Sequence, residues 1–77
     1  MGQAYKTKDM YEASALIAKG VKAMTLERGN GHFWFVFSEG DSCSRLSEEY
    51  WRDELEVRAK DYADAIRSLK DRLFAKG

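Results

Sequence analysis

Apolar residues recur along this chain with two different spacings, and these spacings predict three helices and three strands. Spacings of three and four residues predict helices over residues 8–19, 45–53 and 60–75. Short runs of β-branched and aromatic residues predict strands over residues 4–7, 21–28 and 32–38. Residues 55–58 alternate between apolar and polar, which allows either a short edge strand or an extended linker.

The helix boundaries carry residues that suit them. Thr7 or Asp9 can cap the first helix with a side-chain oxygen, and Gly20 suits the left-handed position beyond its end. The small polar cluster at residues 41–44 is typical of a loop and a cap, so the second helix is expected to begin after it.

The second and third strands are expected to form a hairpin, because Gly29-Asn30-Gly31 lies between them and Asn-Gly favours a type I′ turn. With Asn30 and Gly31 as turn residues, Leu26 falls opposite Phe35 and Met24 falls opposite Phe37. These four residues share one face, which is the predicted core. The other face then carries Thr25, Glu27, Trp34 and Val36.

The fold class that follows is α+β, with the order β-α-β-β-α-α and the helices packed on a small, mostly antiparallel sheet. Residues 1–77 are too few for more than one domain. The aromatic residues Phe33, Phe35 and Phe37 are the expected filling beneath the first and third helices.

Trp34 points away from this core, and its surroundings have two interpretations. In one, the second helix covers Trp34 through Leu46, Tyr50 and Trp51, which completes a monomer. In the other, Trp34 and Val36 form an exposed contact patch, because an exposed tryptophan is a common anchor of protein interfaces.

The composition of the chain disfavours several classes of protein. The chain has 13 basic and 13 acidic residues, which disfavours a dominant phosphate-binding surface. The longest apolar run, Phe33–Phe37, is far too short to span a membrane, and the sequence starts with no secretory signal pattern. A lone Cys43 forms no internal disulfide, so a reducing, cytoplasmic location is expected.

The candidates for catalysis and metal binding are weak. His32 and Cys43 lie on different predicted elements with no supporting motif, so no catalytic pair is expected. The acidic residues of segment 48–56 lack the loop spacing of a calcium site. With one cysteine and one histidine, the chain has too few ligands for a typical zinc site. We therefore expect no enzyme activity, cofactor, metal or small-molecule substrate.

Three segments of the chain form a distinctive combination: the Tyr5-Lys6-Thr7-Lys8-Asp9 start, the aromatic strand Phe33–Phe37, and the closing Leu69-Lys70-Asp71-Arg72. Together they resemble a family of small bacterial, archaeal and phage-borne domains of unknown function. The resemblance implies a free-standing small domain of prokaryotic or phage origin. It implies no mechanism and no catalytic residue.

The resulting hypothesis is a non-catalytic interaction module that binds a protein partner or a second copy of itself, through the Trp34 face or the edge of the second strand. Trp34 and Val36 supply the apolar surface, and Lys22, Glu27 and Arg28 set orientation at its rim. The alternative is a nucleic-acid-binding domain, since the aromatic strand faintly resembles that of RNA-recognition motifs. Its predicted contacts are made by Lys6, Lys22, Arg28, His32 and Trp34.

Overall fold

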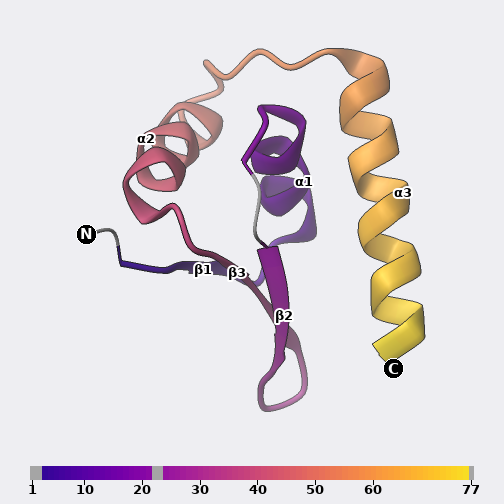
Figure 1. Cartoon of the computed structure of the whole chain (residues 1–77). Coiled ribbons are helices and arrows are strands. Elements are labelled where there is room, and N and C mark those ends of the chain that lie inside the picture. Colours follow the sequence, from indigo (N-terminus) through magenta and orange to yellow (C-terminus); the bar gives the residue numbers. More distant parts are fainter. Residues whose placement is uncertain (1–2, 22–23, 77) are drawn as a thin grey trace.

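The computed structural model of the chain describes residues 3–21 and 24–76 (Figure 1). The six elements follow one another as β1 (Tyr5–Thr7), α1 (Met10–Ala18), β2 (Met24–Arg28), β3 (Phe33–Phe37), α2 (Gly40–Trp51) and α3 (Ala59–Lys76). The strands form one antiparallel sheet in the order β1-β3-β2. The predicted α+β class and element order are thereby confirmed. Part of the strand predicted over residues 21–28 lies outside the described residues.

The hairpin has the predicted register. Leu26 pairs with Phe35, Met24 pairs with Phe37, and Glu27 pairs with Trp34 on the opposite face. The predicted type I′ turn is wrong, because that turn needs a positive φ at both central residues and only Gly31, at 75°, has one. The loop keeps its predicted length, because the N–H of Gly29 bonds to the carbonyl of His32, and this length sets the register.

All three helices lie on one side of the sheet, and Figure 1 shows none on the other side. Phe35 and Phe37 point toward the helices and are almost completely buried, whereas Phe33 is only partly buried. A single apolar core joins the sheet to the helices. Its buried members are Ala13, Leu16, Val21, Met24, Phe35, Phe37, Cys43 and Leu69.

Local bonds define where α1 begins and ends. The Asp9 side chain accepts hydrogen bonds from the backbone N–H groups of Tyr11 and Glu12, at 2.8 and 3.0 Å. Gly20 has a φ of 97° beyond the end of the helix, and the N–H of Val21 bonds to the carbonyl of Leu16. Both predicted boundary signals are confirmed.

Helix α2 begins at Gly40, five residues earlier than predicted, so the expectation of a loop at residues 41–44 is wrong. Small polar residues favour turns where local conformational preference determines the backbone structure. Here burial decides instead, because Cys43 is fully buried in the core and Ser47, one turn later, is also buried. Residues 54–58 form no strand, so the extended-linker alternative is the one observed.

Gly40 is required by a close approach of two backbone segments. A Cβ atom at this position would lie 1.8 Å from the carbonyl oxygen of Gln3, far inside contact distance. The N-terminal segment therefore lies directly against the first turn of α2.

We expect Gly40→Ala to lower the free energy of unfolding by roughly 1–3 kcal/mol, because either the N-terminal segment or the helix must shift. Urea denaturation monitored by circular dichroism measures the loss. Ser44→Ala, at an exposed position of the same helix, is the control and should change stability by less than about 0.5 kcal/mol. Equal stabilities of the two variants would contradict the tight packing at Gly40.

Candidate functional site

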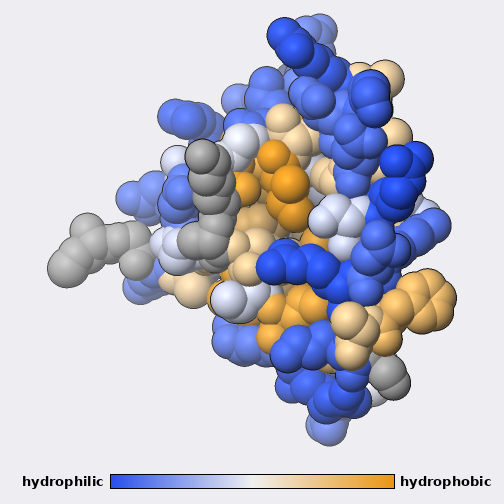
Figure 2. Space-filling model, turned by 45° about the vertical axis from the view of Figure 1, so that its right-hand side comes forward, coloured by the Kyte–Doolittle hydropathy of each residue, from blue (hydrophilic) through white to orange (hydrophobic). Residues whose placement is uncertain are grey.

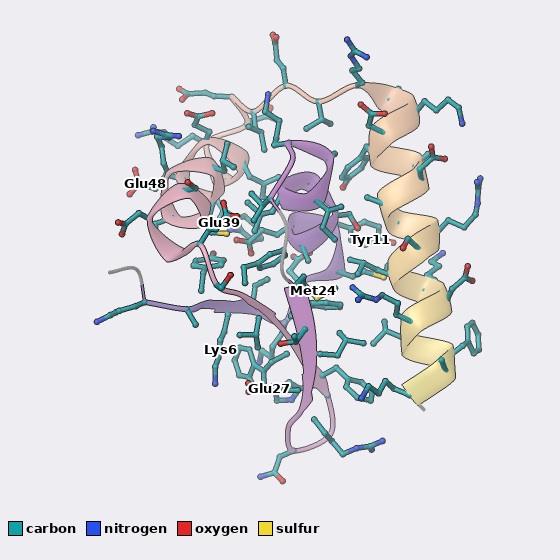
Figure 3. All side chains as sticks on the ribbon, viewed as in Figure 1. Lys6, Tyr11, Met24, Glu27, Glu39 and Glu48 are labelled. Atoms are coloured by element: carbon teal, nitrogen blue, oxygen red, sulfur yellow. The ribbon has the colours of Figure 1, made fainter. Side chains whose placement is uncertain are left out.

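The side of the sheet that carries no helix is the surface that sequence reasoning singled out, and we call it the open face. Figure 3 shows Lys6 and Glu27 extending from β1 and β2 away from the helices. Their side chains form an ion pair at 3.3 Å, and each is about half exposed. Val36 and Trp34 lie on the central strand between them, paired with Lys6 and Glu27 respectively.

Trp34 is partly buried by neighbours from the sheet and the hairpin. The His32 ring meets its indole edge-on with ring centroids 5.0 Å apart, and the Lys8 ammonium lies 5.8 Å from the indole centroid. The indole also lies against Gly29, where a Cβ would come within 2.9 Å of the Trp34 Nε1. These contacts hold the indole in one orientation and leave part of it accessible.

The interpretation in which the second helix covers Trp34 does not fit the structure. Leu46 of α2 packs against the core on the opposite side of the sheet. Tyr50 and Trp51 instead line a groove shared with Tyr62 of α3, and Trp51 is 62% exposed. Trp34 is left partly exposed, whereas Val36 is buried at 9% exposure, so the expectation that both residues are exposed is wrong for Val36.

The remaining predicted contact residues are not all brought together. Arg28 is paired with Phe33, and its guanidinium lies over the Phe33 ring, 5.0 Å from the centroid, on the helix side of the sheet. Its Nη2 also donates to the Lys76 carbonyl at 3.4 Å. The sheet therefore separates Arg28 from Trp34, and Lys22 lies outside the described residues.

His32 and Cys43 do not form a catalytic pair. Cys43 is fully buried in the core, and this burial, reinforced by the charge of Glu39, raises the pKa of its thiol to about 11. His32 lies in the hairpin, where its Nδ1 is 2.9 Å from the Asn30 carbonyl. The described residues also contain no group of three or more histidine, cysteine or acidic side chains placed to hold a metal ion.

A buried polar network ties β1 to α1 and α2, and sequence reasoning missed it. The Glu12 side chain is 2% exposed, and it accepts hydrogen bonds from the Tyr5 hydroxyl and, at 2.7 Å, from the Thr7 hydroxyl. Tyr5 is also hydrogen-bonded to Ser47 of α2 at 2.7 Å. The N–H of Asp9 donates to Thr7 Oγ1 at 3.1 Å. This network gives the Tyr-Lys-Thr-x-Asp pattern a structural role.

One signal for the network was present in the sequence. Asp9 and Glu12 have the spacing of a capping box, in which the second acidic residue returns to the backbone N–H of the cap. In this fold Thr7 takes that N–H, and Glu12 bonds to the Thr7 hydroxyl instead. The extra Tyr5 contact depends on strand pairing and was not accessible from spacing alone.

A second accessible surface lies along the outer edge of β2, which pairs with β3 on one side only. A groove of about 540 Å³ separates this strand from the C-terminal half of α3. Figure 2 shows apolar side chains gathered in a hollow that hydrophilic residues border, on the side of the molecule that α3 occupies. The groove is lined by Met24, Thr25, Leu26, Arg72, Ala75 and Lys76.

A comparison with known protein families finds a match over most of the chain. A family profile described as Domain of unknown function (DUF5659) matches residues 2–75. The chain belongs to this family. The predicted resemblance to a small domain family of unknown function is confirmed, and the family description names no activity. No curated protein and no solved structure matches the chain significantly. No helix in the described ranges is long and apolar enough to cross a membrane.

We expect Glu12→Ala to reduce the free energy of unfolding by roughly 2–4 kcal/mol, because the hydroxyls of Tyr5 and Thr7 lose their buried acceptor. Glu12→Gln keeps one acceptor oxygen and should lose about half as much or less. Urea denaturation of both variants measures the difference. If the two substitutions cost the same, the loss reflects packing of the side chain and not its hydrogen bonds.

Alkaline pH should destabilise the domain. Burial and the bond to Glu12 raise the pKa of Tyr5 to about 12, and burial, with the neighbouring Tyr62, raises the pKa of Tyr50 to about 12. Because the unfolded chain releases these protons near the ordinary tyrosine pKa of about 10, the folded state loses stability as the pH rises from about 10 to 12. Cys43, with its raised pKa, extends this range down to about pH 9.

Urea midpoints measured at pH 8, 10 and 11 check this expectation. Tyr5→Phe removes one of the titrating groups, so its midpoint should fall less between pH 10 and 11 than that of the unmodified chain. An identical fall in both proteins would show that Tyr5 does not contribute.

Proposed function

We propose that this domain is a non-catalytic interaction module that binds a protein partner, or a second copy of itself, through the open face of its sheet. One observation carries the proposal. The central strand β3 directs Trp34, which is partly exposed, and Val36, which is buried at 9% exposure, to a face that none of the three helices covers. Aromatic residues of this kind contribute most of the binding energy in many protein interfaces.

The charged residues around Trp34 support the same function. The ion pair between Lys6 and Glu27, with Lys8 over the indole, forms a polar border around the apolar centre. An apolar centre with a polar rim is the common arrangement of protein interfaces. The indole is already oriented by His32 and Gly29, so binding requires little additional ordering of this side chain.

The nucleic-acid alternative has less support. Its proposed phosphate contacts include Lys6, which is paired with Glu27, and Arg28, which lies on the other side of the sheet from Trp34. Binding through phosphate contacts would weaken steeply as salt rises. Binding that changes little between low and moderate salt therefore favours a protein partner.

Replacing Trp34 by Glu tests the open face. We expect Trp34→Glu to abolish self-association in sedimentation equilibrium, or to abolish capture of the partner from an extract of the source cells, with unchanged circular dichroism. The buried negative charge at the centre of the contact would have no compensating group.

Trp51→Glu is the matched control, since it makes the same substitution at an exposed tryptophan of α2. It should leave binding intact. If both variants retain binding equally, or both lose it equally, the open face is not the binding surface.

A further inference from the structure

We infer that the outer edge of β2 is a second binding site, which takes an extended, acidic and apolar segment of another protein as a fourth strand of the sheet. This site is separate from the open face, because its side chains point to the helix side of the sheet. Three features of the molecule support this site: the backbone groups that β2 leaves available for hydrogen bonds, the groove beside the strand, and the charges around the groove.

The free backbone groups of β2 can be assigned from the hairpin. The N–H of Gly29 bonds to the carbonyl of His32 at 2.8 Å, which makes these two residues a hydrogen-bonded pair. Because such pairs alternate along antiparallel strands, Glu27 and Thr25 also bond to β3. The backbone groups of Met24, Leu26 and Arg28 therefore point outward, and within the described residues no backbone group pairs with them.

The groove beside this edge provides an apolar floor. Met24 and Leu26 line it from the strand, and Ala75 lines it from α3. Side chains of an added strand that point to the helix side would enter this groove.

The charges around the groove indicate the chemistry of the partner. Arg72 and Lys76 line it from α3, and the Arg72 Nη1 reaches across to the Met24 sulfur at 3.9 Å. Arg28 stands at the end of the strand and bonds to the Lys76 carbonyl. Three basic side chains thus border an apolar floor, and they complement an extended segment in which acidic and apolar residues are mixed.

The same charges disfavour a second copy of this chain as the occupant. If two copies of the chain paired through β2 about a twofold axis, the basic patch of one copy would face the same patch of the second copy. This patch consists of Arg28, Arg72 and Lys76. Like charges facing one another across such a contact are unfavourable. A foreign acidic strand meets no such repulsion.

Two capped, fluorescein-labelled peptides test the inference, one with four Val-Glu repeats and one with four Val-Lys repeats. Fluorescence anisotropy with the full chain should show the glutamate peptide binding at least roughly tenfold more tightly than the lysine peptide at low salt. Amide resonances of Leu26 and Arg28 should shift on binding. Arg72→Glu, at an exposed helix position, should weaken binding of the glutamate peptide and strengthen binding of the lysine peptide.

A pair of substitutions at Arg28 isolates the strand pairing. Arg28→Ala removes the charge, whereas Arg28→Pro also removes the outward N–H without breaking the ladder to β3. The proline variant should bind the glutamate peptide roughly fivefold more weakly than the alanine variant. Trp34→Glu should leave peptide binding unchanged, so failure of this site and failure of the open face are distinguishable.

Four results would overturn the inference. They are equal affinity for the two peptides, no effect of Arg72→Glu, self-association that shifts the β2 amides, and displacement of the glutamate peptide by an equimolar single-stranded oligonucleotide.

Discussion

The buried carboxylate of Glu12 is the constraint on which the arrangement of the first half of the chain depends. A buried acidic group is costly unless hydrogen-bond donors surround it. Tyr5 and Thr7 supply these donors, and both point to the helix side of the sheet because they are two residues apart on β1. The same carboxylate therefore fixes which face β1 turns toward α1. Through Tyr5 and Ser47 it also fixes the approach of α2.

This arrangement makes the sheet one-sided. With Tyr5 and Thr7 directed to the helices, the alternation along β1 leaves Lys6 on the opposite side, next to Val36 of β3. All three helices then pack on the side that carries Phe35 and Phe37, because their apolar stripes have only that surface to cover. The partial exposure of Trp34 is thus a consequence of the same alternation that buries Phe35 and Phe37.

The sequence was sufficient for features that depend on short-range patterns. The register of the hairpin followed from alternation around Asn30 and Gly31, and the ends of α1 followed from Asp9 and Gly20. Features that depend on tertiary contacts were not accessible in this way. The start of α2 depends on the burial of Cys43 in the core. Helical periodicity shows that a helix has an apolar side, but it does not indicate which side of a sheet that helix covers. For that reason the surroundings of Trp34 stayed open, and Arg28 was grouped with residues from which the sheet separates it.

Net charge was also a poor guide to the surfaces of this domain. The 13 basic and 13 acidic residues cancel over the whole chain, yet they are unevenly distributed in space. The basic side chains of Arg28, Arg72 and Lys76 gather where the end of α3 meets β2, although Arg28 and Lys76 are 48 positions apart in the sequence. At the open face, in contrast, Lys6 is offset by Glu27. Since screened electrostatic attraction acts over about 10 Å or less, a partner responds to these local groups and not to the neutral total. The two surfaces can therefore favour partners of different charge.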